Sequence, residues 1–167
     1  MTRPSLNVVM MANALTWAAR STCSSRVSVG AVLSTAGGRV VATGYNGSAR
    51  GQPHCDDVGC DMVDGHCVRA IHAEENCILQ CALYGVSTHG LIMFVTQSPC
   101  PRCCKRIIQA EISGIIFLNP YGSTEKSTME LYHAKIFCVR MSAEERNQLN
   151  EFLLTLSTNY SILNGSG

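Results

Sequence analysis

The chain has 167 residues, enough for one compact domain with a sizeable core. Hydrophobic residues make up 46% of it and charged residues only 15%, which excludes a disordered tail protein. Thirteen Lys and Arg residues against twelve Asp and Glu leave a net charge of +1, without a basic run. We therefore expect a small substrate and neither nucleic acid nor a membrane as partner. Since we find no signal peptide and no apolar stretch of membrane-spanning length, we expect a cytoplasmic protein.

The first part of the chain predicts a helix followed by a β-hairpin. Ser5 can cap a helix that carries apolar residues at helical spacing to about Arg20. Two strands follow, Val27–Thr35 and Arg39–Tyr45, and a tight turn over Ala36–Gly38 joins them.

The part after residue 71 alternates helices and strands. We predict helices over His72–Tyr84, Pro101–Ala110, Ser127–Tyr132 and Ala143–Leu156, and strands over Leu91–Thr96, Gly114–Leu118 and Lys135–Arg140. This alternation predicts an α/β fold in three layers, with a mixed five-stranded sheet covered by helices on both faces. Because no repeat or linker interrupts the pattern, we predict a single domain over residues 1–163 and a disordered end over 164–167.

One imidazole, one carboxylate and two thiols stand at the starts of two predicted helices. His72 and Glu74 begin the first, and Pro99, Cys100 and Cys103 supply a P-C-x-x-C pattern at the second. An H-x-E pattern with P-C-x-x-C is typical of zinc-dependent base deaminases. We expect His72, Cys100 and Cys103 to bind a catalytic zinc and to leave one position open for water, whose pKa then falls from about 16 toward about 7.

Glu74 is the expected catalytic proton shuttle. It would take a proton from the zinc-activated water, deliver it to a ring nitrogen and then protonate the departing ammonia. A solvated glutamate at a helix start is the alternative, but His72 and the two spaced cysteines favour catalysis. Residues two apart do not share a helix face, so His72 and Glu74 can reach one site only if it lies end-on to the first turn.

Three segments resemble a known family: GYNG at residues 44–47, CVRAIHAEEN at 67–76 and VTQSPCPRC at 95–103. They resemble the deoxycytidylate (dCMP) deaminases of the bacterial and viral type, over about Ala18–Tyr121. The resemblance implies a cytidine-deaminase-like α/β/α fold and hydrolysis of dCMP to dUMP and ammonia, which supplies dUMP for thymidylate synthesis.

The same resemblance implies four substrate-binding residues. Asn46 would hydrogen-bond the sugar, and Tyr121 would pack near the sugar and phosphate. Ala73 and Ser98 would present main-chain groups to the cytosine and its leaving amine. Asn46 could instead be a turn residue with positive φ, and Tyr121 could serve surface packing. Arg26 is the candidate phosphate contact, because a guanidinium group suits a phosphate, and a solvated strand-end arginine is the alternative.

A long loop over residues 46–67 lacks periodicity and needs something to hold it in place. Three cysteines lie in it, and a fourth lies in the irregular segment 21–25. Four thiolates would close a tetrahedral structural zinc site formed by Cys23, Cys55, Cys60 and Cys67. His54 and His66 are rival ligands, and reduced thiols in a flexible loop are the alternative. The cysteines expected in the core are Cys77, Cys81, Cys104 and Cys138.

Other functions stay open. A free (deoxy)cytidine nucleoside deaminase would more often carry Cys in place of His72, a deaminase of nucleic-acid bases would need a basic channel, and a non-enzymatic zinc-binding module would leave Glu74 idle. The resemblance also implies a homo-oligomer, with a hexamer as the specific form, and regulation by dCTP and dTTP with magnesium. One departure is Glu111, where such enzymes usually carry Gly; if the position needs a positive φ, the turn must differ locally.

Overall fold

A computed structural model describes residues 3–24, 27–122 and 125–163 of the chain. A five-stranded sheet forms its centre, with the strand order β2-β1-β7-β8-β9. The strands are β1 (Gly30–Ser34), β2 (Val40–Tyr45), β7 (Ile92–Gln97), β8 (Gly114–Asn119) and β9 (Phe137–Arg140). The sequence patterns predicted each of these strands, although β1 begins three residues later than expected.

The sheet is mixed. β1 is antiparallel to both β2 and β7, whereas β8 is parallel to β7 and β9 is parallel to β8. The tight turn between β1 and β2 forms as predicted, with the Gly38 N–H bonded to the Thr35 carbonyl at 2.9 Å. The parallel strands are joined by helical crossovers, because a parallel connection must return over a face of the sheet.

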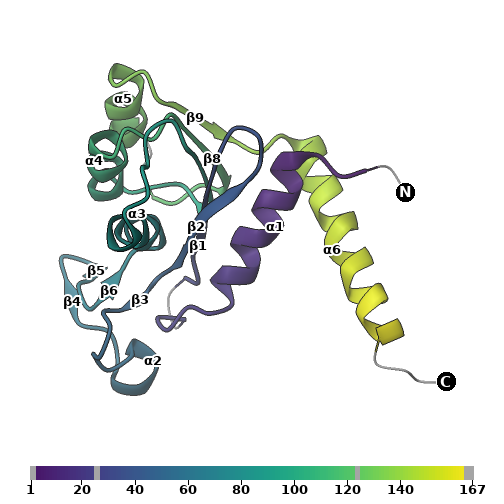
Figure 1. The fold of residues 1–167 in the computed structure, drawn as a ribbon. Helices are drawn as coiled ribbons and strands as arrows, with labels where there is room; N and C mark the ends of the chain where they lie inside the picture. Colours follow the sequence, from purple (N-terminus) through teal and green to yellow (C-terminus); the bar gives the residue numbers. More distant parts are fainter. Residues whose placement is uncertain (1–2, 25–26, 123–124, 164–167) are drawn as a thin grey trace.

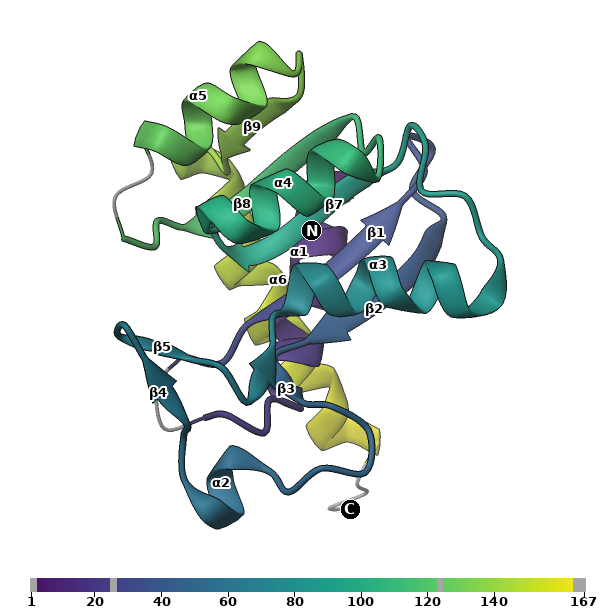
Figure 2. The same cartoon turned by 90° about the vertical axis from the view of Figure 1, so that its left-hand side faces the viewer.

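Helices cover both faces of the sheet (Figure 1). One face carries α1 (Leu6–Ala18) and α6 (Ala143–Leu163). The other carries α3 (Ala73–Tyr84), α4 (Pro101–Gln109) and α5 (Glu125–His133), as Figure 2 shows from the side. The predicted three-layer α/β/α fold is therefore confirmed. The first helix ends two residues before Arg20, and the last continues seven residues beyond its predicted end at Leu156.

Alternate residues of the central strands point to the two helical layers. Val32 and Phe94 pack in the cluster below α1 and α6. Leu33 and Met93, each one position away, pack in the cluster below α3 and α4. This period of two follows from the pleat of a strand, and it gives the sheet two separate apolar cores.

Two glycines let a helix approach the sheet closely, one on each face. A side chain at Gly30 would overlap the Ala14 carbonyl oxygen of α1. A side chain at Gly44 would overlap the Ala73 carbonyl oxygen at the start of α3 and come within 2.9 Å of the Cys77 nitrogen. Gly44 thus allows the first turn of α3 to lie directly on β2.

The segment without periodicity contains only short elements: α2 (Cys55–Val58), β3 (Gly47–Ser48), β4 (Met62–Val63), β5 (His66–Cys67) and β6 (Ala70–Ile71). β3 pairs with β6 and β4 with β5, in two small antiparallel ladders. Ladders of two residues are too short to produce a detectable pattern of alternation, so the sequence did not predict them.

Glu111, at the position where the resemblance led us to expect Gly, has φ of 54°. The position therefore keeps a left-handed conformation and places a glutamate in it, at a cost of about 1 kcal/mol. Among the described helices, none is both long and apolar enough to cross a bilayer. The predicted disordered end at 164–167 lies outside the described residues, and the single domain over 1–163 stays a prediction.

Candidate active site and a second cysteine cluster

A cavity of about 210 Å³ opens beyond the end of β7, where α3 and α4 begin. Such a position outside the carboxyl ends of parallel strands is where α/β proteins commonly bind ligands. The residues that line it are Cys23, Val27, Val29, Asn46, Cys67, Ala70, His72, Ala73, Glu74, Gln97, Ser98, Cys100 and Tyr121. The cavity thus gathers segments from almost the whole first two thirds of the chain.

Three metal-binding side chains meet at one wall of this cavity. His72 is the N-cap of α3, and Cys100 is the N-cap of α4, which continues with Pro at its first position. The Nδ1 atom of His72 lies 3.6 Å from the Cys100 sulfur and 3.3 Å from the Cys103 sulfur. Both helices begin at the site, so the predicted end-on arrangement is present.

These donors fit a zinc ion. Tetrahedral coordination with Zn–S of about 2.3 Å and Zn–N of about 2.0 Å requires nitrogen and sulfur ligands about 3.5 Å apart, and the three donor atoms all lie within 4.8 Å of one another. Three protein ligands leave a fourth position open. His72 and Cys100 line the cavity, so the open position can be reached by a small molecule.

The thiols are electrostatically prepared for metal binding. A hydrogen bond from Cys103 lowers the pKa of Cys100 to about 3, although burial opposes this, and a bond from His72 lowers it further. The same bond with Cys100, together with burial, raises the pKa of Cys103. The hydrogen bond with Cys100 also raises the pKa of His72. One thiolate therefore forms readily, and a metal ion must displace the proton that remains between the two sulfurs.

Glu74 lies in the first turn of α3 and lines the cavity, with only 4% of its surface exposed. Burial raises the pKa of its carboxyl, although its own backbone N–H and the nearby His72 oppose the shift. It is not a solvated helix-start glutamate, so that alternative is excluded. A buried carboxyl that lines the same cavity as the three donors is placed to accept a proton and to release it to a bound molecule.

Asn46 lines the cavity, and the left-handed conformations among the described non-glycine residues do not include it. The alternative of a turn residue with positive φ is therefore wrong. Its Oδ1 accepts a hydrogen bond from the Val29 N–H at 2.7 Å, and its Nδ2 donates to the Val27 carbonyl at 2.9 Å. Asn46 thus holds the segment before β1 against the cavity and keeps one amide hydrogen for a ligand.

Ser98 and Tyr121 are linked at the opposite wall. The Ser98 hydroxyl accepts a hydrogen bond from the Tyr121 N–H at 2.8 Å, and the Ser98 N–H donates to the Asn119 carbonyl at 2.8 Å. Both residues line the cavity, as does the fully buried Ala73. Arg26, the candidate phosphate contact, lies outside the described residues.

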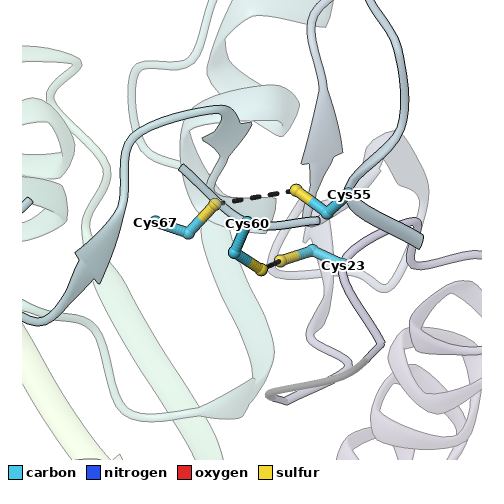
Figure 3. A group of neighbouring side chains, drawn as sticks. All are labelled: Cys23, Cys55, Cys60 and Cys67. Carbon is cyan, nitrogen blue, oxygen red and sulfur yellow. Dashed lines mark hydrogen bonds between the residues drawn. The ribbon is translucent and has the colours of Figure 1, made fainter. Parts of the chain in front are cut away.

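A second cluster consists of four cysteines beside the cavity (Figure 3). The sulfurs of Cys23 and Cys60 are 3.5 Å apart, those of Cys55 and Cys67 are 3.6 Å apart, and all four lie within 4.8 Å of one another. These separations exceed the length of a disulfide bond and suit the edges of a tetrahedron of thiolates around one metal ion. His54 is the N-cap of α2 and is not in this group; the side chain of His66 lies outside the described set.

Backbone groups prepare Cys67 of this four-cysteine cluster for metal binding. Burial raises its pKa, but hydrogen bonds with the backbone of Ala70, the Cys55 side chain and the backbone of Arg69 and Asp61 outweigh burial and lower the pKa to about 7. Burial raises the pKa of both Cys23 and Cys55. The cluster therefore combines one readily ionised sulfur with buried ones that need a cation to ionise.

The sequence and the fold are both similar to those of known proteins. A family model described as the cytidine and deoxycytidylate deaminase zinc-binding region matches residues 5–119. The chain belongs to the cytidine and deoxycytidylate deaminase family.

Several members of this family are similar over most of the chain. It is 44% identical over 156 residues to the Bacillus subtilis protein named ComE operon protein 2, covering 93% of this chain and 78% of that one. It is 30% identical over 161 residues to the deoxycytidylate deaminase of Enterobacteria phage T4, covering 73% and 83%. The structure of dCMP deaminase from cyanophage S-TIM5 in complex with dCMP and dUMP matches with a TM-score of 0.73 at 29% identity, covering 84% of this chain and all of that one.

Sequence reasoning missed part of the cavity wall of this deaminase. Val27, Val29, Ala70 and Gln97 line the cavity, yet none carries a group that marks it as functional. Their only signal is position: Val29 directly precedes β1, Ala70 begins β6 and Gln97 ends β7, whereas Val27 lies three residues before β1. Cys23 and Cys67 of the four-cysteine cluster were expected to bind metal, but their position in the cavity wall was not expected.

Proposed function

We propose that this enzyme hydrolyses dCMP to dUMP and ammonia. The observation that carries the proposal is the buried carboxylate of Glu74, which lines the same cavity as the three donors His72, Cys100 and Cys103. Membership of the family supports deamination. The names of the T4 relative and of the S-TIM5 structure, which holds dCMP and dUMP, support this nucleotide as the substrate.

His72, Cys100 and Cys103 would hold zinc, which when bound lowers the pKa of a coordinated water toward about 7 and so supplies a nucleophile. Glu74 would accept a proton from the attacking water as the water oxygen bonds to C4 of the cytosine. The carboxyl then delivers this proton to the ring nitrogen N3. It takes the second proton of the former water and donates it to the departing amino group, which leaves as ammonia.

The cavity walls would orient the nucleotide. The remaining amide hydrogen of Asn46 is available to the sugar, because the other polar atoms of that side chain are bonded to the backbone. Main-chain groups of Ala73 and Ser98 would face the base. Ser98 holds the Tyr121 backbone, which would place the Tyr121 ring beside the sugar and phosphate. Arg26 remains the proposed phosphate contact.

We further propose that the four-cysteine cluster of Cys23, Cys55, Cys60 and Cys67 binds a second, structural zinc. Four thiolates leave no open position, so this ion would hold the loops rather than take part in the reaction. Polar contacts support the same role: Asp56, next to Cys55, accepts hydrogen bonds from the Ser24 N–H and hydroxyl at 3.0 Å each. The ion would thereby hold the cavity wall to which Cys23 and Cys67 belong.

Our proposals on assembly and regulation rest on the family resemblance alone. We propose a homo-oligomer, with a hexamer as the specific form, and opposite effects of dCTP and dTTP in the presence of magnesium. Sedimentation measures the first. Activity titrated with both triphosphates measures the second, and a rate that neither changes would remove regulation from the proposal.

Glu74→Gln tests the reaction. The substitution keeps the shape of the side chain and removes its proton-transfer capacity, so we expect kcat to fall by about 10²–10⁴-fold while zinc content is unchanged. The control substrate is deoxycytidine, which lacks the phosphate. Retained activity in the variant would contradict the role of Glu74, and equal kcat/KM for deoxycytidine and dCMP would contradict the choice of a nucleotide.

A further inference from the structure

A network of charged side chains joins α3 to α4 just behind the three metal donors. The Glu75 carboxylate on α3 accepts a hydrogen bond from the Arg106 Nε at 3.0 Å, and its other oxygen lies 3.7 Å from the Arg102 Nη2. The Arg106 Nη1 donates to the Arg102 carbonyl at 3.1 Å. Glu75 and Arg102 lie inside the segments that carry the family resemblance, but the expected mechanism gives no role to either of them or to Arg106.

The network connects the two helices that carry the donors. Glu75 lies three residues after His72, and Arg102 lies between Cys100 and Cys103. Figure 2 shows α3 and α4 on the same face of the sheet, and their first turns meet at the cavity. A shift of one helix along the other would therefore change the separation between the imidazole and the two sulfurs.

Apolar packing contributes to the register of the two helices but has little directional specificity. Cys77 of α3 and Ile107 of α4 belong to one buried cluster, and hydrophobic contact is non-directional. Zinc, by contrast, needs its ligands within about 0.2 Å of the ideal distances. A guanidinium group bonded to both a carboxylate and a carbonyl is directional, because its donors are fixed in one plane.

We propose that Glu75 and Arg106, with Arg102, act as positioning residues that hold the starts of α3 and α4 in the register at which His72, Cys100 and Cys103 bind zinc. The inference deepens the proposed function, on which its catalytic consequence rests. The Glu75 side chain is only 17% exposed, and that of Arg106 36%. Glu75 is thus shielded from solvent, whereas Arg106 is partly exposed and Arg102, at 60%, is exposed.

The pair His89 and Glu111 provides the matched control. It also joins an acidic to a basic side chain, but at 3.8 Å and with 76% and 70% of the side chains exposed. It lies beyond the far ends of α3 and α4, away from the cavity. Glu111→Gln removes the same charge as Glu75→Gln without touching the proposed network.

The experiment compares Glu75→Gln, Arg106→Gln, their double variant, Arg106→Lys and Glu111→Gln. Zinc affinity is measured by competition with a chelator, and the ligand geometry by the absorption spectrum of the cobalt-substituted protein. We expect each single substitution in the network to weaken the binding of one zinc by about 10-fold and to alter the cobalt spectrum. The double variant should lose no more than either single one, because both remove the same contact.

Two further readouts separate positioning from stability. At saturating zinc, kcat for dCMP should fall while KM stays unchanged, because the network does not line the cavity. Arg106→Lys should behave like Arg106→Gln. A single ammonium group cannot reproduce the fixed geometry in which the guanidinium donates to both Glu75 and the Arg102 carbonyl. Glu111→Gln should match the wild type in every measurement.

Three results would overturn the proposal. The first is an unchanged zinc affinity and cobalt spectrum in Glu75→Gln and Arg106→Gln, with only a lower resistance to unfolding by urea. This result would mean that the pair contributes to stability alone. The second is an Arg106→Lys variant with the zinc affinity and cobalt spectrum of the wild type, which would mean that the positive charge alone is required. Because this variant keeps the charge, it also carries the test if Glu75→Gln does not fold. The third is an equal effect of Glu111→Gln. A wild type without dCMP turnover would refute the proposed function instead, since the zinc and cobalt measurements do not need substrate.

Discussion

The two clusters of candidate metal ligands differ in the number of ligands and in the structural elements that hold them. His72, Cys100 and Cys103 stand at the starts of two helices that rest on the central sheet, and they leave one position open toward the cavity. The four-cysteine cluster draws its members from short elements and irregular segments and leaves no position open. Under the proposal, zinc would serve catalysis in the first cluster, because its open coordination position admits water. In the second cluster, zinc would only hold the loops in order.

The difference in support also predicts what each cluster depends on. The ordered sheet, the N-cap positions and the close approach at Gly44 hold the catalytic donors in place before any metal binds. The loops around the four-cysteine cluster bury little apolar surface, so under the proposal of a second zinc their order depends more on the metal itself. Removal of a ligand should thus affect activity at the first cluster and stability at the second.

Cys103→Ser gives the largest expected effect on activity. Loss of one of three ligands should remove the catalytic zinc, and the lowered water pKa is worth up to about 12 kcal/mol, so turnover of dCMP should fall by more than about 10⁴-fold. The free energy of unfolding should change little beyond the zinc contribution. Zinc per chain and activity measured on one preparation check this. Full activity with one zinc lost would mean that the roles of the two clusters are reversed.

Cys60→Ser should lower zinc content from two ions per chain to one and keep most of kcat. Because Cys23 and Cys67 line the cavity, we expect KM for dCMP to rise. The unfolding free energy should fall by about 4 kcal/mol if zinc is present at a thousand times its Kd. Cys138→Ala, at a half-buried cysteine outside both clusters, is the control. One zinc per chain in the wild type would remove the second site.

Gly44→Ala tests whether the sheet supports the catalytic cluster. The new methyl group would overlap the Ala73 carbonyl oxygen, and the backbone of β2 and α3 would have to separate. We expect a loss of about 1–3 kcal/mol in unfolding free energy and weaker binding of the catalytic zinc alone. Gly37→Ala provides the control, because the nearest atom is 3.9 Å away, at Thr35. Equal loss of both zinc ions would argue against separate support.

The smallest expected effect lies far from both clusters, at Glu145. Burial raises the pKa of its carboxyl, but hydrogen bonds from the Asn7 amide at 2.7 Å and the Ser142 N–H at 2.9 Å outweigh burial and lower it. A lowered folded-state pKa stabilises the protein above the unfolded pKa of about 4.3, and this contribution is lost as the pH falls. Glu145→Gln should cost less than about 1 kcal/mol at pH 7 and less still at pH 3, measured by urea unfolding against the wild type at the same pH, with zinc content at pH 7 unchanged. A cost that is the same at both pH values would exclude the charge as its cause.

Much of the fold could be predicted because its signals are local. The strands carry apolar runs, Ser5 and Pro101 mark helix starts, and the strand and helix order limits the topology. The direction of β9 was not predictable, because it depends on how α5 returns over the sheet. The two-residue ladders of the loop were not predictable either, since they are too short for a periodic pattern.

The sequence by itself determined the chemistry of the candidate site. An imidazole, a carboxylate and two thiols at helix starts predict three donors that meet and a carboxylate beside them, and the structure places the four side chains together. Their helical positions follow from capping, which acts within a few residues.

Only the tertiary structure decided which distant residues become neighbours. Asn46 bonds the backbone of Val27 and Val29, and Glu75 reaches Arg106 on another helix. No local propensity specifies such contacts. They arise when the helices pack on the sheet and the loops close, because only then does the energy gained from burial and hydrogen bonding exceed the entropy lost in joining distant parts of the chain.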